Sequence, residues 1–168
     1  HIIEELQKFR IDCMYGKKKH YNARDRYTAY HKKIGITIII ITAFMGTSVY
    51  YYLSENSLLL IRIVTGFLTV AVAVLAALQT YLNFEKEACS HKATADRYLW
   101  LVKEVQLILS YYRYGSKTVT EVQKTMGNFF REAKDIQTTE LETSIGDYQK
   151  ARESVENDEE TYTDKEKI

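Results

Sequence analysis

Two octets in the sequence carry the residue types best suited to proton chemistry. The first is HYNARDRY, from His20 to Tyr27, and the second is HKATADRY, from His91 to Tyr98. Imidazole titrates near neutral pH and a phenol can hydrogen-bond to it, so these four positions could form a polar seam that fixes the register of two helices. A protonation switch at either histidine and a chance repetition of the pattern are the alternatives.

The rest of the sequence does not indicate an enzyme or a metalloprotein. A catalytic site needs a nucleophile, a base and an orienting group that converge in one pocket, and no such set is indicated. No carboxylate or cysteine joins the histidines at a metal-ligand interval, and Cys13 and Cys89 form no CxxC motif. No glycine-rich phosphate loop is present. We therefore expect no catalytic, metal-binding or cofactor-binding residues.

Two uncharged stretches of twenty residues each, Ile34–Leu53 and Ile63–Leu82, lie between the octets. A hydrocarbon core of about 30 Å needs about 20 helical residues, so each stretch is long enough to cross a bilayer. The alternative is a pair of buried helices in a soluble bundle, but such helices seldom lack a polar face for so long. We expect transmembrane helices at 34–53 and 63–83.

A turn of four residues, Ser54–Ser57, separates the two stretches, and it predicts a helical hairpin with a short extracytoplasmic segment at 54–62. Basic residues flank the outer ends of both stretches, so the positive-inside rule places both termini in the cytoplasm. The basic and aromatic run YGKKKHY could mark nucleic-acid contact, but beside a membrane span it favours lipid headgroups. We expect a lipid bilayer and no specific nucleic acid as partner.

The predicted spans offer one charged residue and one packing face. Arg62 borders the second span, where it either reaches the headgroups or forms a charged ring at a pore mouth. Small residues allow the close backbone approach by which helices associate in lipid. In the second span such residues recur at every fourth position, and in the first span glycine adds another: Thr65, Thr69, Ala73, Ala77 and Gly46. The pattern leaves open whether the partner is the other span, another subunit or a pore axis.

Beyond the second span an apolar seam with heptad spacing predicts a helix over 84–114 that continues the span into the cytoplasm. Its expected partner is the basic and aromatic helix over 1–33 that leads into the first span. In an antiparallel pair, positions equally far from the membrane lie at the same level. This register places His20 level with Tyr98 and Tyr27 level with His91.

The C-terminal region is predicted to hold one more helix. Gly115 is the expected end of the preceding helix. Apolar residues then recur at threes and fours and predict an amphipathic helix within 115–152, packed on the cytoplasmic stem. The acidic tail over 153–168 has little apolar content, and we expect it to fray. The fold class is therefore an all-α membrane protein: a two-span hairpin extended into a cytoplasmic helical stem, plus a C-terminal amphipathic helix.

The order of these parts resembles the SLATT domain family. The resemblance rests on KKKHYNARDRYTAYHKK before the hairpin and on FEKEACSHKATADRYLWLVKEVQLIL after it. It implies a two-transmembrane effector of bacterial anti-phage systems, in the inner membrane, that forms pores or disrupts the membrane and arrests or kills the infected cell. It also implies a homo-oligomer and a separate sensor or nucleotide-signalling protein as partner.

A passive membrane anchor or scaffold that recruits a soluble partner is the alternative function. An intramembrane enzyme is disfavoured because neither predicted span carries Asp, Glu, His, Cys or Lys.

Overall fold

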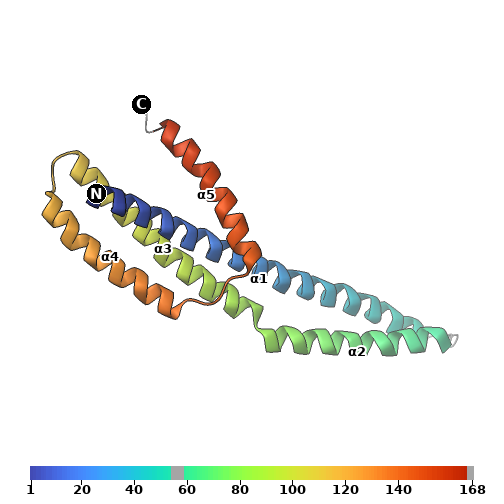
Figure 1. The fold of residues 1–168 in the computed structure, drawn as a ribbon. Coiled ribbons are helices and arrows are strands. Elements are labelled where there is room, and N and C mark those ends of the chain that lie inside the picture. Colours follow the sequence, from blue (N-terminus) through green and yellow to red (C-terminus); the bar gives the residue numbers. More distant parts are fainter. Residues whose placement is uncertain (54–58, 166–168) are drawn as a thin grey trace. The chain divides into compact units, whose positions relative to one another are not determined.

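The computed structural model describes residues 1–53 and 59–165, and it describes the side chains of all of these except 48–53, 61 and 158–165. Every regular element in this part of the chain is an α-helix (Figure 1). In order, the helices are α1 (Ile2–Leu53), α2 (Leu59–Leu82), α3 (Phe84–Arg113), α4 (Val119–Thr139) and α5 (Ile145–Lys165). The all-α prediction is confirmed for these residues.

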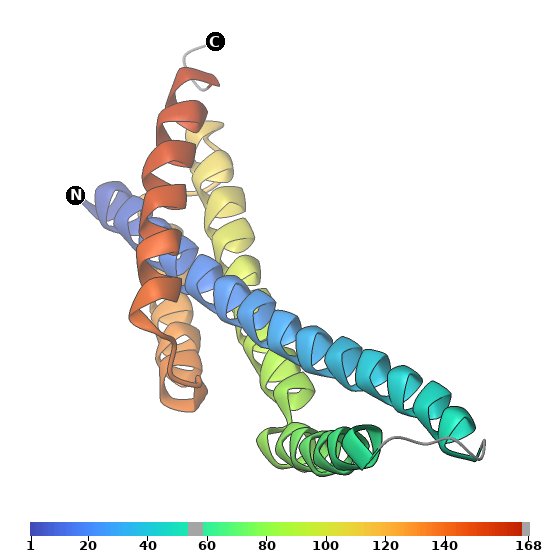
Figure 2. The same ribbon diagram turned by 90° about the vertical axis from the view of Figure 1, so that its right-hand side faces the viewer.

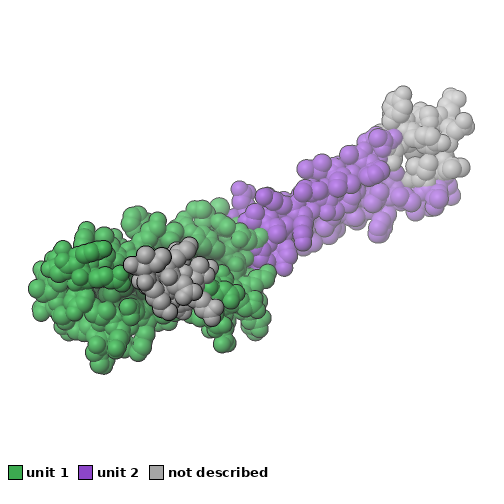
Figure 3. All heavy atoms as spheres, turned by 90° about the horizontal axis from the view of Figure 1, so that it is seen from above, with its two compact units in different colours: residues 1–25, 88–168 green, residues 26–87 purple. Residues whose placement is uncertain are grey.

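The helices divide into two units, which Figure 3 colours separately. Unit 1 comprises residues 1–25 and 88–168, and unit 2 comprises residues 26–87. Unit 1 therefore contains the N-terminal part of α1, nearly all of α3, and both α4 and α5. Unit 2 contains the rest of α1, all of α2 and the first turn of α3. The absence of proline from the sequence permits a helix as long as α1.

All four helices of unit 1 contribute to one apolar core of described residues. Figures 1 and 2 show the ribbons of these helices from two sides. Phe9 of α1 joins α1 to α4, because its ring lies 6.5 Å from that of Phe129 and 4.8 Å from that of Phe130. Burying a side chain of this size contributes about 1.5–3 kcal/mol. The buried cluster comprises Leu6, Phe9, Cys13, Met14, Tyr98, Leu101, Val102, Val105, Ile108, Val122, Phe129, Ala133, Ile136 and Val155.

Unit 2 is held by polar and aromatic contacts between α1 and the residues around the start of α3. The ring of Phe84 lies 6.2 Å from Tyr27 and 5.8 Å from Tyr30. A 3.4 Å contact joins Gln79 Nε2 to His31 Nδ1. The predicted turn at Ser54–Ser57 lies outside the described residues, and α2 begins at Leu59, one turn earlier than the expected start at 63.

The helix expected to run without a break from the second span into the stem is interrupted at one residue. Asn83 separates α2 from α3 and has a φ of 42°. Asparagine tolerates this left-handed conformation better than most residues because its short side chain can hydrogen-bond locally. Hydrogen bonds from Asn83 N to Gln79 O and from Glu87 N to Asn83 O, both 3.2 Å, nevertheless continue the α-helical pattern across it.

Gly115 ends α3, as the sequence predicts. Its φ is 72°, its N–H bonds to Tyr112 O, and the N–H of Ser116 bonds to Tyr111 O, which together form a Schellman motif. The next helix then starts at a capping box, in which Thr118 and Glu121 bond to each other's backbone N–H groups.

Two expectations for the C-terminal region are wrong. The region 115–152 is not one amphipathic helix, because α4 ends at Thr139 and α5 begins at Ile145. Residues 153–165 are not a frayed tail, because α5 continues to Lys165 and buries Val155. Two apolar side chains, Ala151 and Val155, four residues apart, supply the buried stripe that packs this helix despite its acidic composition.

Candidate functional site

A polar cluster lies buried inside unit 1, and two predicted residues are at its centre. His20 of α1 and His91 of α3 have fully buried side chains, and their Nδ1 atoms lie 2.9 Å apart. Each sits in the apolar stripe of its helix, where a core residue would be expected. One of the two Nδ1 atoms therefore donates a hydrogen bond to the other across the α1–α3 interface.

Glu140, in the link between α4 and α5, completes this cluster. Its Oε2 accepts hydrogen bonds from Tyr98 OH at 2.8 Å and from His20 Nε2 at 3.1 Å, and its Oε1 accepts from Lys19 Nζ at 2.8 Å. We use the term polar cluster for Lys19, His20, His91, Tyr98 and Glu140. Its members come from α1, α3 and the α4–α5 link, so it joins three segments that are distant in sequence.

The electrostatics of the cluster favour an ionised Glu140. Burial works to raise the pKa of this carboxyl, but the hydrogen bonds from His20, Lys19 and Tyr98 outweigh burial and lower the pKa to about 2. Burial, together with the hydrogen bond to Glu140, raises the pKa of Tyr98, so the phenol keeps its proton and donates it.

The ionised carboxylate also determines where His20 holds a proton. An ionised carboxylate can only accept, so Nε2 of His20 must be the protonated partner. If His20 is neutral, its Nδ1 accepts a hydrogen bond from Nδ1–H of His91. If His20 is an imidazolium, its Nδ1–H donates to Nδ1 of His91 instead. One arrangement of heavy atoms thus suits two proton states.

Gly16 provides the space that Tyr98 occupies. A Cβ atom at this position would lie only 2.8 Å from Cε1 and Cζ of the Tyr98 ring. Any larger residue would displace the ring, and with it the phenol that binds Glu140. No sequence pattern predicts this role of Gly16, because the contact joins residues of two helices that are more than eighty positions apart in the chain.

The four octet residues do not all meet in one place. His20, His91 and Tyr98 lie together, with the rings of His20 and Tyr98 6.1 Å apart. Tyr27 belongs to unit 2, where it contacts Phe84 and the Arg26 guanidinium, whose carbon lies 4.5 Å from the centre of its ring. Glu140 and Lys19 were not predicted, and a residue beyond a helix end gives no periodic signal that could have identified Glu140.

The helices of unit 2 expose apolar side chains. The exposed fraction is 67% for Phe44 on α1 and 74% for Phe67 on α2. Over the described residues, one helical run, Arg62–Arg113, is long and apolar enough by length and composition to cross a membrane, and none of its most apolar window is buried. The last six residues of the predicted first span lie where side chains are not described.

Several threonine hydroxyl groups on these apolar helices bond to the backbone of their own helix. Thr42 donates to Ile38 O, Thr69 donates to Thr65 O and Thr80 donates to Ala76 O, at distances of 2.8–3.0 Å. A hydroxyl bonded to its own helix backbone leaves no unpaired donor, which is the requirement that lipid imposes.

The predicted small-residue face lies to one side of α2. Thr69, Ala73 and Ala77 are exposed and Thr65 is half-buried, while a Cβ atom added at Gly46 on α1 would meet nothing within 4 Å. Arg62 is exposed in the first turn of α2.

Among the described residues, no group of three or more His, Cys, Asp or Glu side chains is placed to hold a metal ion.

An all-α chain with a long apolar helical run and exposed apolar helices has the features of a helical membrane protein. The comparison with protein families identifies which one. Residues 3–166 match the family described as SMODS and SLOG-associating 2TM effector domain family 4, and the chain belongs to this family. The resemblance to SLATT domains is thus confirmed over nearly the whole chain. No curated protein and no solved structure matches it.

Proposed function

We propose that this protein is the membrane effector of a bacterial anti-phage system, and that several copies together form a pore or disrupt the inner membrane. A separate SMODS or SLOG signalling protein is the trigger. The observation that supports this proposal most directly is the match to the two-transmembrane effector family over residues 3–166. In this proposal α2 and residues 34–53 of α1 both span the bilayer, and both termini lie in the cytoplasm.

The exposed apolar surface of unit 2 supports membrane insertion. Large apolar side chains on soluble proteins are rarely exposed over such a length of helix, since water would penalise them. On α2 the large exposed apolar side chains lie along one broad face of the helix: Leu59, Leu60, Ile63, Val64, Phe67, Val70, Val74 and Leu78. A bilayer is the solvent that suits this surface.

Oligomerisation follows from the number of spans. Two helices cannot enclose a water-filled path, so conduction requires several copies of the chain. The exposed small residues Thr69, Ala73 and Ala77 provide a face where a neighbouring helix can approach closely. Arg62, at the start of α2, then lies at the rim of the assembly, either among headgroups or around a pore mouth.

Propidium uptake and membrane potential, measured in bacteria that express the protein with its signalling partner, test this proposal. Ala73→Phe should abolish uptake by blocking the small-residue face. Val74→Phe, on an adjacent exposed position, is the matched control and should retain it. Growth arrest with intact membranes would contradict the proposal.

A passive anchor is distinguished by exchanging both spans for an unrelated helical hairpin. If the spans serve only for attachment, the exchanged protein keeps its biological activity, and the pore proposal is then wrong. If the spans form the pore, activity is lost although unit 1 remains folded and membrane-bound.

A further inference from the structure

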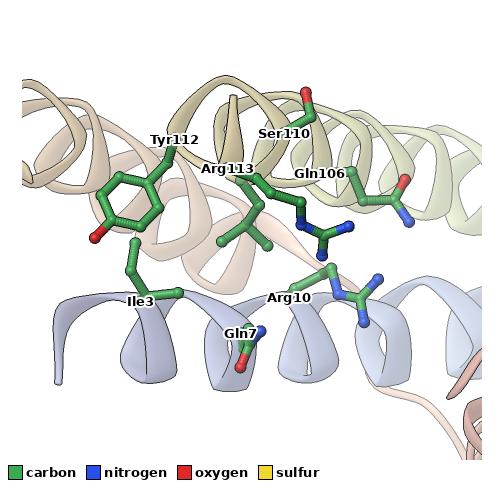
Figure 4. Close-up of a pocket in the computed structure, with 8 residues that line it drawn as sticks. Ile3, Gln7, Arg10, Gln106, Ser110, Tyr112 and Arg113 are labelled. Atoms are coloured by element: carbon green, nitrogen blue, oxygen red, sulfur yellow. The ribbon is translucent and has the colours of Figure 1, made fainter. Parts of the chain in front are cut away.

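A cavity of about 490 Å³ in unit 1 lies apart from the polar cluster, between the N-terminal part of α1 and the C-terminal part of α3 (Figure 4). Its volume lies within the range of about 300–1,000 Å³ that is usual for small-molecule sites. The lining residues are Ile3, Gln7, Arg10, Gln106, Leu109, Ser110, Tyr112 and Arg113.

The charged residues that line this cavity are both arginines. Arg10 extends from α1 and Arg113 from α3, and Figure 4 shows both guanidinium groups in the space between the two helices. No aspartate or glutamate is among the lining residues. Two guanidinium groups without a nearby anion repel each other, and an anion between them would remove that repulsion.

Arg10 carries the strongest sign of an unfilled site. Its Nε atom is buried, and it has no hydrogen-bond partner in the part of the chain that the structure describes. Leaving a buried guanidinium donor unpaired is costly. Arg97, elsewhere in unit 1, shows the usual solution, because it pairs with Glu132 at 2.8 Å and also with Asp135.

The remaining lining residues suit a small organic anion. Gln7 and Gln106 can donate amide hydrogen bonds to oxygen atoms, while Ile3, Leu109 and Tyr112 provide apolar and aromatic surface. Guanidinium groups match the geometry of phosphate oxygens and bind them through paired hydrogen bonds. Gln106 and Arg113 are exposed, so a ligand can enter from the solvent.

We propose that this cavity binds a phosphate-bearing small molecule or headgroup, with Arg10 and Arg113 as the principal ligands of the phosphate. This inference is independent of pore formation, because it concerns only contacts within unit 1. A soluble phosphate and a phospholipid headgroup offer the same chemistry, so the experiment contains one arm for each.

The first arm measures binding to the full-length protein in detergent micelles. The probes are inorganic phosphate, pyrophosphate and phenyl phosphate, with sodium chloride at matched ionic strength as the salt control. If the ligand is a soluble phosphate, at least one phosphate probe should raise the melting temperature, and its binding should reach saturation. Arg10→Gln and Arg113→Gln should each weaken this binding about tenfold or more, since each removes a charge-assisted hydrogen bond. Arg131→Gln, an exposed arginine on α4, should bind as the wild type does.

The second arm measures binding to vesicles of phosphatidylglycerol in phosphatidylcholine. A headgroup site gives an Arg10-dependent preference for the anionic vesicles and no response to soluble phosphates. A soluble-ligand site gives the reverse.

The melting temperature without ligand separates a binding role from a structural one. If the two arginines bind a ligand, neither glutamine variant should lower the melting temperature of the ligand-free protein, because each substitution relieves the repulsion between two cations. A lowered melting temperature with unchanged probe binding would overturn the proposal, and so would equal responses in Arg131→Gln and Arg10→Gln. The absence of any response to all probes and vesicles would also overturn it.

Discussion

Replacing Glu140 with glutamine removes the negative charge to which Lys19, His20 and Tyr98 donate hydrogen bonds. Glutamine has nearly the same size and keeps one accepting oxygen, but its NH2 group donates hydrogen bonds, so one accepting position is lost together with the charge. Hydrogen bonds to charged groups contribute about 1.5–3 kcal/mol each, and they partly replace one another when shared. We expect the free energy of unfolding of unit 1 to fall by about 2–3 kcal/mol at pH 7.

The pKa of Glu140 sets the pH dependence of this loss. In the folded protein burial works to raise the pKa, but hydrogen bonds from His20, Lys19 and Tyr98 lower it from its ordinary value of 4.5 to about 2. Because the folded value is the lower one, the stabilisation is complete above pH 4.5 and is lost as the pH falls toward 2. It amounts to about 3 kcal/mol at most, since the carboxylate is partly exposed to solvent.

The assay is chemical denaturation of the full-length protein in detergent micelles, followed by tryptophan fluorescence. The chain has a single tryptophan, Trp100, in the part of α3 that belongs to unit 1, so the signal reports this unit. The difference between wild type and Glu140→Gln should be smaller at pH 3 than at pH 7 by about 2 kcal/mol. Glu142→Gln, at a nearby exposed position, is the control and should show no such change. An equal difference at both pH values would refute the ionised cluster.

Three further changes test the packing around the cluster. Gly16→Ala should destabilise unit 1 by about 1–3 kcal/mol because its Cβ would clash with Tyr98, whereas Gly127→Ala, with open space around it, should stabilise α4 by up to about 1 kcal/mol in the same thermal melt. Tyr98→Phe should cost about 1–3 kcal/mol in denaturant titrations and reduce the acid sensitivity, and an unchanged pH profile would exclude its bond to Glu140. Val155→Ala should cost about 1–3 kcal/mol, and hydrogen exchange should show faster opening of α5; no effect would mean that α5 is unpacked.

Much of the architecture was accessible from the sequence because it depends on local patterns. The two long uncharged stretches predict the apolar helices, and apolar residues spaced three and four positions apart predict the buried face of α3. The structure buries six of the nine residues of the predicted heptad seam, while Phe84 and Leu109 are half-buried and Tyr112 is exposed. The six buried residues are Ala88, His91, Ala95, Tyr98, Val102 and Val105. Gly115 was identifiable as a helix end because only a residue tolerant of positive φ suits a Schellman motif.

The missed features depend on contacts between distant segments. The partners of Glu140 lie more than forty positions away in the sequence, and no repeat or spacing relates it to them. The apolar spacing of the predicted amphipathic helix continues through residues 141–148, but α4 ends at Thr139 and Glu140 is its C-cap residue. Asp147 is buried although aspartate is usually exposed to solvent. Hydrogen bonds at the start of α5 explain this burial, because the N–H and the hydroxyl group of Ser144 both donate to the Asp147 carboxylate.

The geometry of the histidine pair narrows the choice between a register-fixing seam and a protonation switch. With one added proton, His20 becomes an imidazolium that still donates from Nε2 to Glu140 and now donates from Nδ1 to His91, so neither contact is lost. With a second proton, Nδ1–H of one ring faces Nδ1–H of the other across 2.9 Å, and two buried cations share one carboxylate. That state cannot keep the contact, because two donors repel and burial penalises the charge. We therefore propose that the cluster fixes the α1–α3 register in both the neutral and the singly protonated states, and that it separates when both histidines are charged.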